Sequence, residues 1–154
     1  MSEDLHHFRS RAVRALVLLH EQQLHDFAEV WKQSNEAGVQ LPETDDEHYC
    51  SLEHLLGHVL QSARAYLRRM LIHLGRPAPD LAPVSALNTI GADLDGDVTY
   101  LLERWRTLLA DVQDSETEPE VYTPGMHYWI DAMLEHAVMH PLRHSFQLRE
   151  LLRA

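Results

Sequence analysis

A single apolar stripe with helical spacing runs through residues 51–74, which read SLEHLLGHVLQSARAYLRRMLIHL. Apolar side chains that recur every three or four positions lie on one face of an α-helix. Ser51 is a favoured N-cap residue, and Gly75 followed by Pro77 predicts the C-terminal end. The stretch therefore predicts a long helix that is buried along one face. Its stripe consists of Leu52, Leu55, Leu56, Val59, Leu60, Ala63, Leu67, Met70 and Leu71.

Three further segments have the same periodicity, and no segment is typical of a β-strand. They are residues 3–33, 97–112 and 123–153. The first is expected to end before Gly38, and the last begins with Thr123 as N-cap and proline at the first helical position. The stripe of the first helix includes Phe8, Ala12, Leu16, Leu19, Leu24, Phe27, Val30 and Trp31, and Asp95 or Asp97 is expected to cap the third helix.

The connection between the second and third helices indicates how the helices are arranged. Residues 75–95 contain three prolines and could extend to about 60–70 Å at roughly 3.3 Å per residue. A helix of 24 residues is only about 36 Å long. The connection can therefore return along the whole bundle and leave the two helices parallel. The sequence predicts an all-α protein, in which residues 1–154 form a single four-helix bundle with up-down-down-up topology.

Composition limits the classes of function and partner. The formal net charge of −11 argues against a nucleic-acid partner, because phosphate neutralisation needs clustered Lys and Arg. No apolar run approaches the ~20 residues of a membrane span, and the acidic N-terminus does not resemble a signal peptide. The single cysteine, Cys50, excludes an intramolecular disulfide and is interpreted as an ordinary packed cysteine. We therefore expect a cytoplasmic protein that has neither a membrane nor a nucleic acid as its partner.

Residues 135–147, EHAVMHPLRHSFQ, carry three histidines four positions apart. Side chains with this spacing lie one above the other on a helix and can reach one metal ion together. At 100° per residue, His144 falls about 30° from the centre of the apolar stripe, His140 about 70° and His136 about 110°. The inward pair is therefore His140 and His144, with His136 near the mouth of the site. Pro141 lies between the pair and predicts a kink.

A third ligand is expected from another helix. His58 lies about 60° beyond the edge of the stripe of its helix, and His54 lies further out. Face geometry therefore favours His58 and predicts an open groove between the second and fourth helices. The other histidines on the first two helices are His6, His7, His20, His25 and His73.

These residues carry a resemblance to a known family. The stretch from Tyr49 to His58, YCSLEHLLGH, followed by His140, His144 and Gln147, resembles the motifs of the DinB superfamily, the DinB/YfiT-like metalloenzymes. The resemblance covers essentially the whole chain. Two departures put any shared substrate contacts in doubt: His54 stands where an acidic residue is common, and Ser145-Phe146 stand where Arg-Gly is usual.

The resemblance implies a homodimer that binds one divalent metal through His58, His140 and His144, and a thiol-dependent enzyme such as an S-transferase. Three neutral imidazoles leave at least one open coordination position, as in catalytic zinc sites. Zinc and nickel suit imidazole best, and the sequence does not separate them from manganese or iron. A small-molecule substrate and a low-molecular-weight thiol co-substrate are expected. Gln147, His136, Tyr128 and His54 are candidates to support the ligands or to line the groove.

Three alternatives stay open at this point. The histidines could be hydrogen-bonded residues at helix–helix contacts. The chain could be a non-catalytic dimeric helical module with incidental metal. It could also be a metal-dependent hydrolase that uses bound water.

Overall fold

The computed structural model describes residues 7–117 and 130–154, and every regular element among them is helical. The long helices are α1 (Arg11–Glu36), α2 (Leu52–His73), α3 (Ile90–Leu109) and α5 (Ile130–Arg153). Two short elements join them, the 3-10 helix η2 (Glu47–Tyr49) and α4 (Asp114–Thr117). The predicted all-α class is confirmed.

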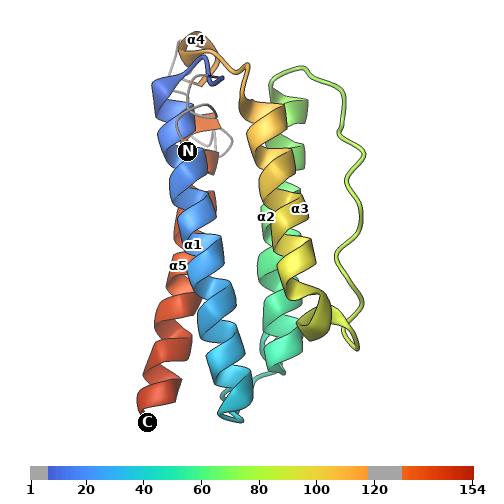
Figure 1. Ribbon diagram of the computed structural model, residues 1–154, viewed down its shortest axis with the longest axis vertical. Helices are drawn as coiled ribbons and strands as arrows, with labels where there is room; N and C mark the ends of the chain where they lie inside the picture. The colour runs from blue at the N-terminus through green and yellow to red at the C-terminus, as the bar shows by residue number, and fades with distance from the viewer. Residues whose placement is uncertain (1–6, 118–129) are drawn as a thin grey trace.

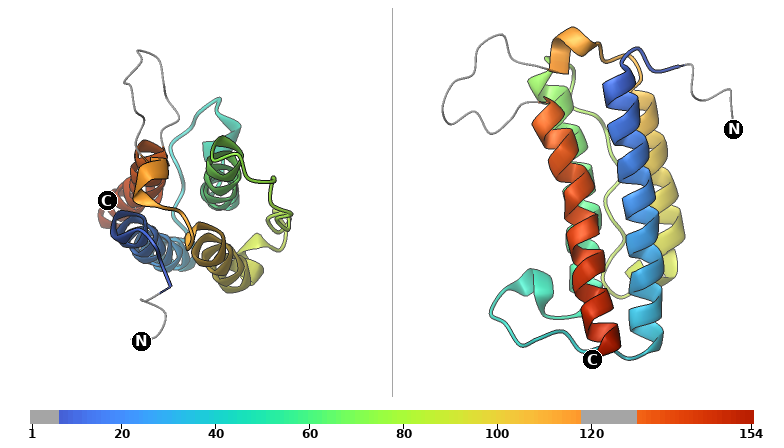
Figure 2. Two further views of the ribbon diagram at one scale, coloured as in Figure 1. Left: turned by 90° about the horizontal axis from the view of Figure 1, so that it is seen from above. Right: turned by 90° about the vertical axis from the view of Figure 1, so that its left-hand side faces the viewer.

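The four long helices lie along one common axis (Figure 1). The helices α1 and α5 run in one direction, and α2 and α3 run in the opposite direction. Seen end-on, α1 lies beside α5, and α2 lies across the bundle beside α3 (Figure 2). The segment between α2 and α3 returns along the outside of this pair. Its 16 residues, 74–89, can span about 53 Å, which exceeds the roughly 33 Å length of α2.

The return segment is held against the two helices that it joins. Leu81 is buried, and the Arg64 guanidinium donates to its carbonyl oxygen at 2.7 Å and to that of Ala82 at 3.0 Å. The Ala82 N–H donates to the Tyr100 hydroxyl at 2.8 Å. These bonds satisfy backbone groups of an irregular segment, which would otherwise depend on water.

The expected cap of the third helix is wrong. The helix α3 begins at Ile90, so Asp95 and Asp97 lie inside it. The Asp97 carboxylate instead accepts hydrogen bonds from the N–H of Ser85 at 3.2 Å and from its hydroxyl at 3.1 Å. Asp97 thus binds the return segment instead of capping α3.

The predicted ends of α1 and α2 are confirmed by their hydrogen bonds. Ser51 accepts from the His54 N–H at 3.1 Å and caps α2. Gly38 and Gly75 follow the C-caps of α1 and α2 with φ of 65° and 72°, a left-handed conformation that favours glycine. The next residue after each glycine bonds back to the last turn, Val39 to Ser34 and Arg76 to Leu71, which completes two Schellman motifs.

Other boundaries differ from the sequence prediction. The helix α1 begins at Arg11 rather than near residue 3, because the Ser10 side chain accepts from the Val13 N–H and caps it there. The predicted start of the last helix, at 123–124, lies outside the described residues. The helix α5 is continuous through Pro141 from Ile130 onwards.

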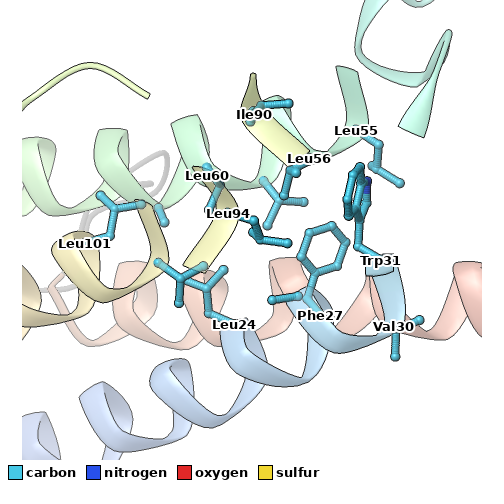
Figure 3. Packing of buried hydrophobic residues seen from close by; sticks show 14 of the residues in the cluster. Leu24, Phe27, Val30, Trp31, Leu55, Leu56, Leu60, Ile90, Leu94 and Leu101 are labelled. Atoms are coloured by element: carbon cyan, nitrogen blue, oxygen red, sulfur yellow. The ribbon is translucent and has the colours of Figure 1, made fainter. Parts of the chain in front are cut away.

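The core consists of two apolar clusters along the bundle axis. One joins Phe27, Trp31, Leu56 and Ile90 with Leu148 of α5 (Figure 3). The other joins residues nearer the opposite end of the bundle: Val13, Val17, Leu67, Met70, Trp105, Leu109, Ile130, Met133, Leu134 and Ala137.

Two buried indoles connect these clusters to the backbone of α2. Trp31 Nε1 donates to the Leu52 carbonyl at 2.7 Å, and Trp105 Nε1 donates to the Ala63 carbonyl at 3.1 Å. All nine predicted stripe residues of α2 are buried, so this prediction is confirmed.

The predicted stripe of α1 is wrong in part of its first half. Phe8 and Leu16 pack half-buried against the core, but Ala12 is exposed and Leu19 is 43% exposed. The buried positions are Val13, Val17 and His20. The buried positions continue the spacing of Leu24 towards the N-terminus, and the polar residue at position 20 concealed that continuity. The His20 ring stacks on Trp105 with centroids 4.0 Å apart.

None of the described helices combines the length and the apolar character that crossing a lipid bilayer requires.

Burial lowers the pKa of His20 to about 3, from an ordinary value of 6.5. Because the unfolded chain then binds the proton more tightly, this histidine stabilises the fold fully above pH 6.5, and the contribution is lost as the pH falls towards 3. When the pH falls from 7.5 to 5, the free energy of unfolding should decrease by about 2 kcal/mol less in His20→Phe than in the wild type. Urea denaturation at the two pH values measures the difference. The exposed His25 on the same helix supplies the control His25→Phe, and equal losses in all three proteins would contradict the prediction.

Candidate metal centre

Three histidine side chains from two helices converge on one point between α2 and α5. His58 comes from α2, and His140 and His144 come from α5. One ring nitrogen from each lies within 4.8 Å of those of the other two. His144 is 1% exposed and His140 is 6% exposed, whereas His136 is exposed. This order of burial is the one that the helical-face analysis predicts.

His58 and His140 face each other through their Nε2 atoms, which are 3.0 Å apart. At this distance the two nitrogens can share a hydrogen, if one ring donates N–H and the other accepts. The same distance suits two ligands of a common cation. This contact alone therefore does not distinguish a structural histidine pair from a metal site.

His144 has its two ring nitrogens in different environments. Nδ1 lies 2.9 Å from Gln147 Oε1, and the amide oxygen can only accept, so His144 donates from Nδ1. A neutral imidazole that is protonated at Nδ1 carries its lone pair on Nε2. That Nε2 atom is buried and has no hydrogen-bond partner among the described residues. Gln147 thus fixes the tautomer that a metal ligand needs.

Burial favours the neutral form of all three imidazoles. Burial is the main cause that lowers the pKa of His140 to about 3 and of His144 to about 4, and neighbouring histidines and Arg143 add to it. Burial also lowers the pKa of His58, with a further contribution from His48. Neutral imidazoles with free lone pairs are the form that binds divalent cations.

The donor set fits a divalent cation. Metal–nitrogen bonds of about 2.0–2.1 Å separate two ligand nitrogens by about 3.3 Å at a tetrahedral angle and about 2.9 Å at a right angle. The His58–His140 separation of 3.0 Å lies at this scale. The third nitrogen lies within 4.8 Å of the others, so a modest ring movement brings it into the same shell.

The 3-10 helix η2 covers one side of the three histidines. The His48 ring stacks on His58 with centroids 4.5 Å apart. The Tyr49 ring lies 5.7 Å from both His58 and His144. Asp46 caps this single turn by accepting from the His48 N–H at 2.9 Å. Sequence reasoning missed His48, and the only local signal was the turn-forming Asp46 two residues earlier.

The other predicted site residues lie further from the centre. His54 is half-buried, and its Nδ1 lies 2.7 Å from Ser51 Oγ at the start of α2 rather than facing the other histidines. The exposed His136 packs its ring edge against Tyr66, at 5.4 Å between centroids, and Tyr66 lies 6.1 Å from His140. Tyr128 lies outside the described residues. The structure therefore gives His136 a place beside the centre and leaves His54 as part of the helix cap.

The interpretation of Cys50 as a packed cysteine is wrong. Its side chain is exposed, and Sγ donates to the Glu47 carbonyl at 3.1 Å. It follows the last residue of η2, where the chain is at the surface.

Comparison of the chain with protein-family models, with curated proteins and with solved structures finds no match. What the site can do is therefore inferred from the geometry of its residues.

In the metal-free protein, we expect His144 to be neutral at pH 6 and protonated at Nδ1, because burial disfavours its charged form and Gln147 accepts from Nδ1. Long-range ¹⁵N–¹H NMR correlations report the tautomer of each ring directly. Gln147→Leu should remove the preference for Nδ1–H, while Gln61→Leu, on the surface of α2, should leave it unchanged. A His144 ring protonated at Nε2 in the wild type would contradict this assignment.

Proposed function

We propose that this chain is a DinB-like metal-dependent enzyme that binds one divalent cation through His58, His140 and His144. The observation that carries the proposal is the buried Nε2 of His144, which has no hydrogen-bond partner among the described residues, in a group of three histidines that each have a ring nitrogen within 4.8 Å of the others. Zinc and nickel are the proposed ions, because both suit imidazole donors.

This observation also favours a metal site over a structural histidine cluster. A hydrogen bond between His58 and His140 satisfies one nitrogen on each of those rings. It leaves His144 Nε2 unsatisfied, and an unsatisfied buried polar atom costs about 1–3 kcal/mol. A shared cation would give all three lone pairs a partner. A metal site therefore gives a partner to His144 Nε2, which a structural histidine cluster leaves without one.

The residues around the three ligands have distinct roles in this proposal. Gln147 holds the His144 ring in the orientation and tautomer of a ligand. His48 and Tyr49 shield one side of the centre from water. A divalent ion with three neutral ligands keeps its full charge and an open position, and it lowers the pKa of a thiol or water that reaches it.

The proposed reaction is transfer of a low-molecular-weight thiol to a small electrophilic substrate, and its support is the resemblance of the His58 and His140–Gln147 motifs to the DinB superfamily. The thiol gives its proton to solvent, and the resulting thiolate attacks an electrophilic carbon. A carbon–sulfur bond forms as the bond to the leaving group breaks, and the leaving group departs with the electron pair. The same resemblance supports a homodimer, and the single cysteine suits a cytoplasmic location.

Removing ligand nitrogens should abolish metal binding. We expect untagged wild-type protein to hold about one divalent ion per chain, as in other three-histidine sites. His140→Ala and His144→Ala should each lose most of it, because two imidazoles cannot hold the ion against solvent. His136→Ala is the matched control, since His136 is on the same helix but exposed. Elemental analysis after dialysis gives the occupancy.

Equal metal content in the wild type and both alanine variants would overturn the metal site, and so would its absence from all of them.

Thiol dependence separates the proposed transferase from a hydrolase and from a non-catalytic module. We expect the metal-loaded protein to accelerate conjugation of a low-molecular-weight thiol to 1-chloro-2,4-dinitrobenzene, because a thiol of lowered pKa supplies more thiolate near neutral pH. The conjugate is followed by absorbance, and His144→Ala is the background. The same acceleration in that variant would contradict catalysis at this centre. Turnover of ester substrates without thiol would instead indicate a hydrolase.

A further inference from the structure

A pocket of about 380 Å³ is lined by residues of the connection between α1 and α2, of α2 and of the C-terminal half of α5. Figure 2 shows this connection beside the C-terminal end of α5. Its volume falls within the range of small-molecule sites, about 300–1,000 Å³. The described residues thus contain a space of ligand size next to the proposed centre.

Two residues belong to both the pocket and the surroundings of the centre. Tyr49 lines the pocket, and its ring lies 5.7 Å from the rings of His58 and His144. Gln147 also lines the pocket and accepts the Nδ1 hydrogen of His144. A molecule in the pocket would therefore contact the side chains that position one ligand and cover the other.

The lining determines the chemistry of the occupant. Leu55 and Leu148 are buried, and Leu41 and Leu151 are half-buried, so the pocket offers an apolar surface. Burial of apolar ligand surface there is favourable.

The charged residues of the lining all carry the same sign. Glu43 and Glu150 are both exposed at the pocket, and none of the described residues that line it is Lys or Arg. Two carboxylates beside an apolar surface attract a cationic group and repel an anionic one. The pocket thus suits an apolar molecule that carries an ammonium group.

We infer that this pocket binds a small apolar amine, whose hydrocarbon part lies against Leu41 and Leu151, and that the bound amine is coupled to the centre through Gln147. The coupling rests on the proposed function. Binding of the amine does not, because none of His58, His140 and His144 is among the described residues that line the pocket.

The test compares hexylammonium, 1-hexanol and hexanoate, which share one hydrocarbon chain and differ in charge. In NMR titrations of the metal-free protein, hexylammonium should bind most tightly, 1-hexanol less tightly and hexanoate least tightly. Exposed charge pairs are weak, so two carboxylates should favour the ammonium over the alcohol by about two- to thirtyfold at low salt. Resonances of Tyr49 and Leu151 should shift on binding.

Two sets of variants test the two properties of the pocket. Glu43→Gln with Glu150→Gln should abolish the preference for ammonium, while Glu36→Gln with Glu135→Gln, on exposed positions elsewhere, should leave it unchanged. Leu151→Trp fills the pocket and should weaken the binding of all three compounds at least tenfold. Equal binding of hexanoate and hexylammonium, or a preference that survives the double glutamine change, would overturn the inference.

A second measurement decides whether the pocket serves the centre. Co²⁺ added to wild type should give visible absorption bands, and hexylammonium should shift them, because Gln147 connects the pocket to His144. Hexylammonium that binds without shifting the bands overturns the coupling of the pocket to the centre and leaves the metal site intact. Absence of Co²⁺ bands overturns the proposed function, and the metal-free titration still decides the binding inference.

Discussion

Three imidazoles that pack against one another, two of them buried, must each find partners for their ring nitrogens. Two of them, His58 and His140, are 82 residues apart in sequence and meet at 3.0 Å. The third, His144, has its Nδ1 bonded to Gln147, so Nε2 carries the lone pair of the neutral ring. A hydrogen bond between His58 and His140 leaves this buried Nε2 without a partner among the described residues. A shared cation would satisfy all three imidazoles, and this constraint underlies the functional proposal.

The bundle supplies the geometry that this constraint needs. The one-turn spacing of His140 and His144 places both rings on the buried face of α5. The Ser51 cap fixes where α2 begins and therefore where His58 points. The capped turn of η2 then brings Tyr49 against two of the rings. Helix ends and a short turn, rather than a long loop, thus position the side chains around the centre.

Much of this arrangement follows from the sequence because it depends on local periodicity. The stripe of α2 and the burial order of the three histidines on α5 follow from 100° per residue. The choice of His58 over His54 follows from the same geometry, and the structure gives His54 a different partner at the helix cap. In each case the apolar neighbours on the same helix determine which side chains face inwards.

Other features could not be predicted, because they depend on contacts between distant segments. His48 meets His58 only after the chain has turned at Asp46, and periodicity does not report such a contact. The sequence predicts Asp97 as a helix cap, and its bond to Ser85 depends on where the return segment lies. His20 is polar, so its burial against Trp105 breaks the apolar pattern that a stripe analysis reads. The pocket could not be predicted either, because its lining residues Leu41 and Leu151 are far apart in the sequence.

The two apolar clusters divide α5 between them. Ala137 belongs to one and Leu148 to the other, and His140 and His144 occupy the interval. At this level His58 of α2 faces His140 and His144 of α5. An ion held by the three imidazoles would therefore join α2 to α5 between the two clusters. It would stabilise the folded protein against unfolding, because only the folded chain holds the three rings together.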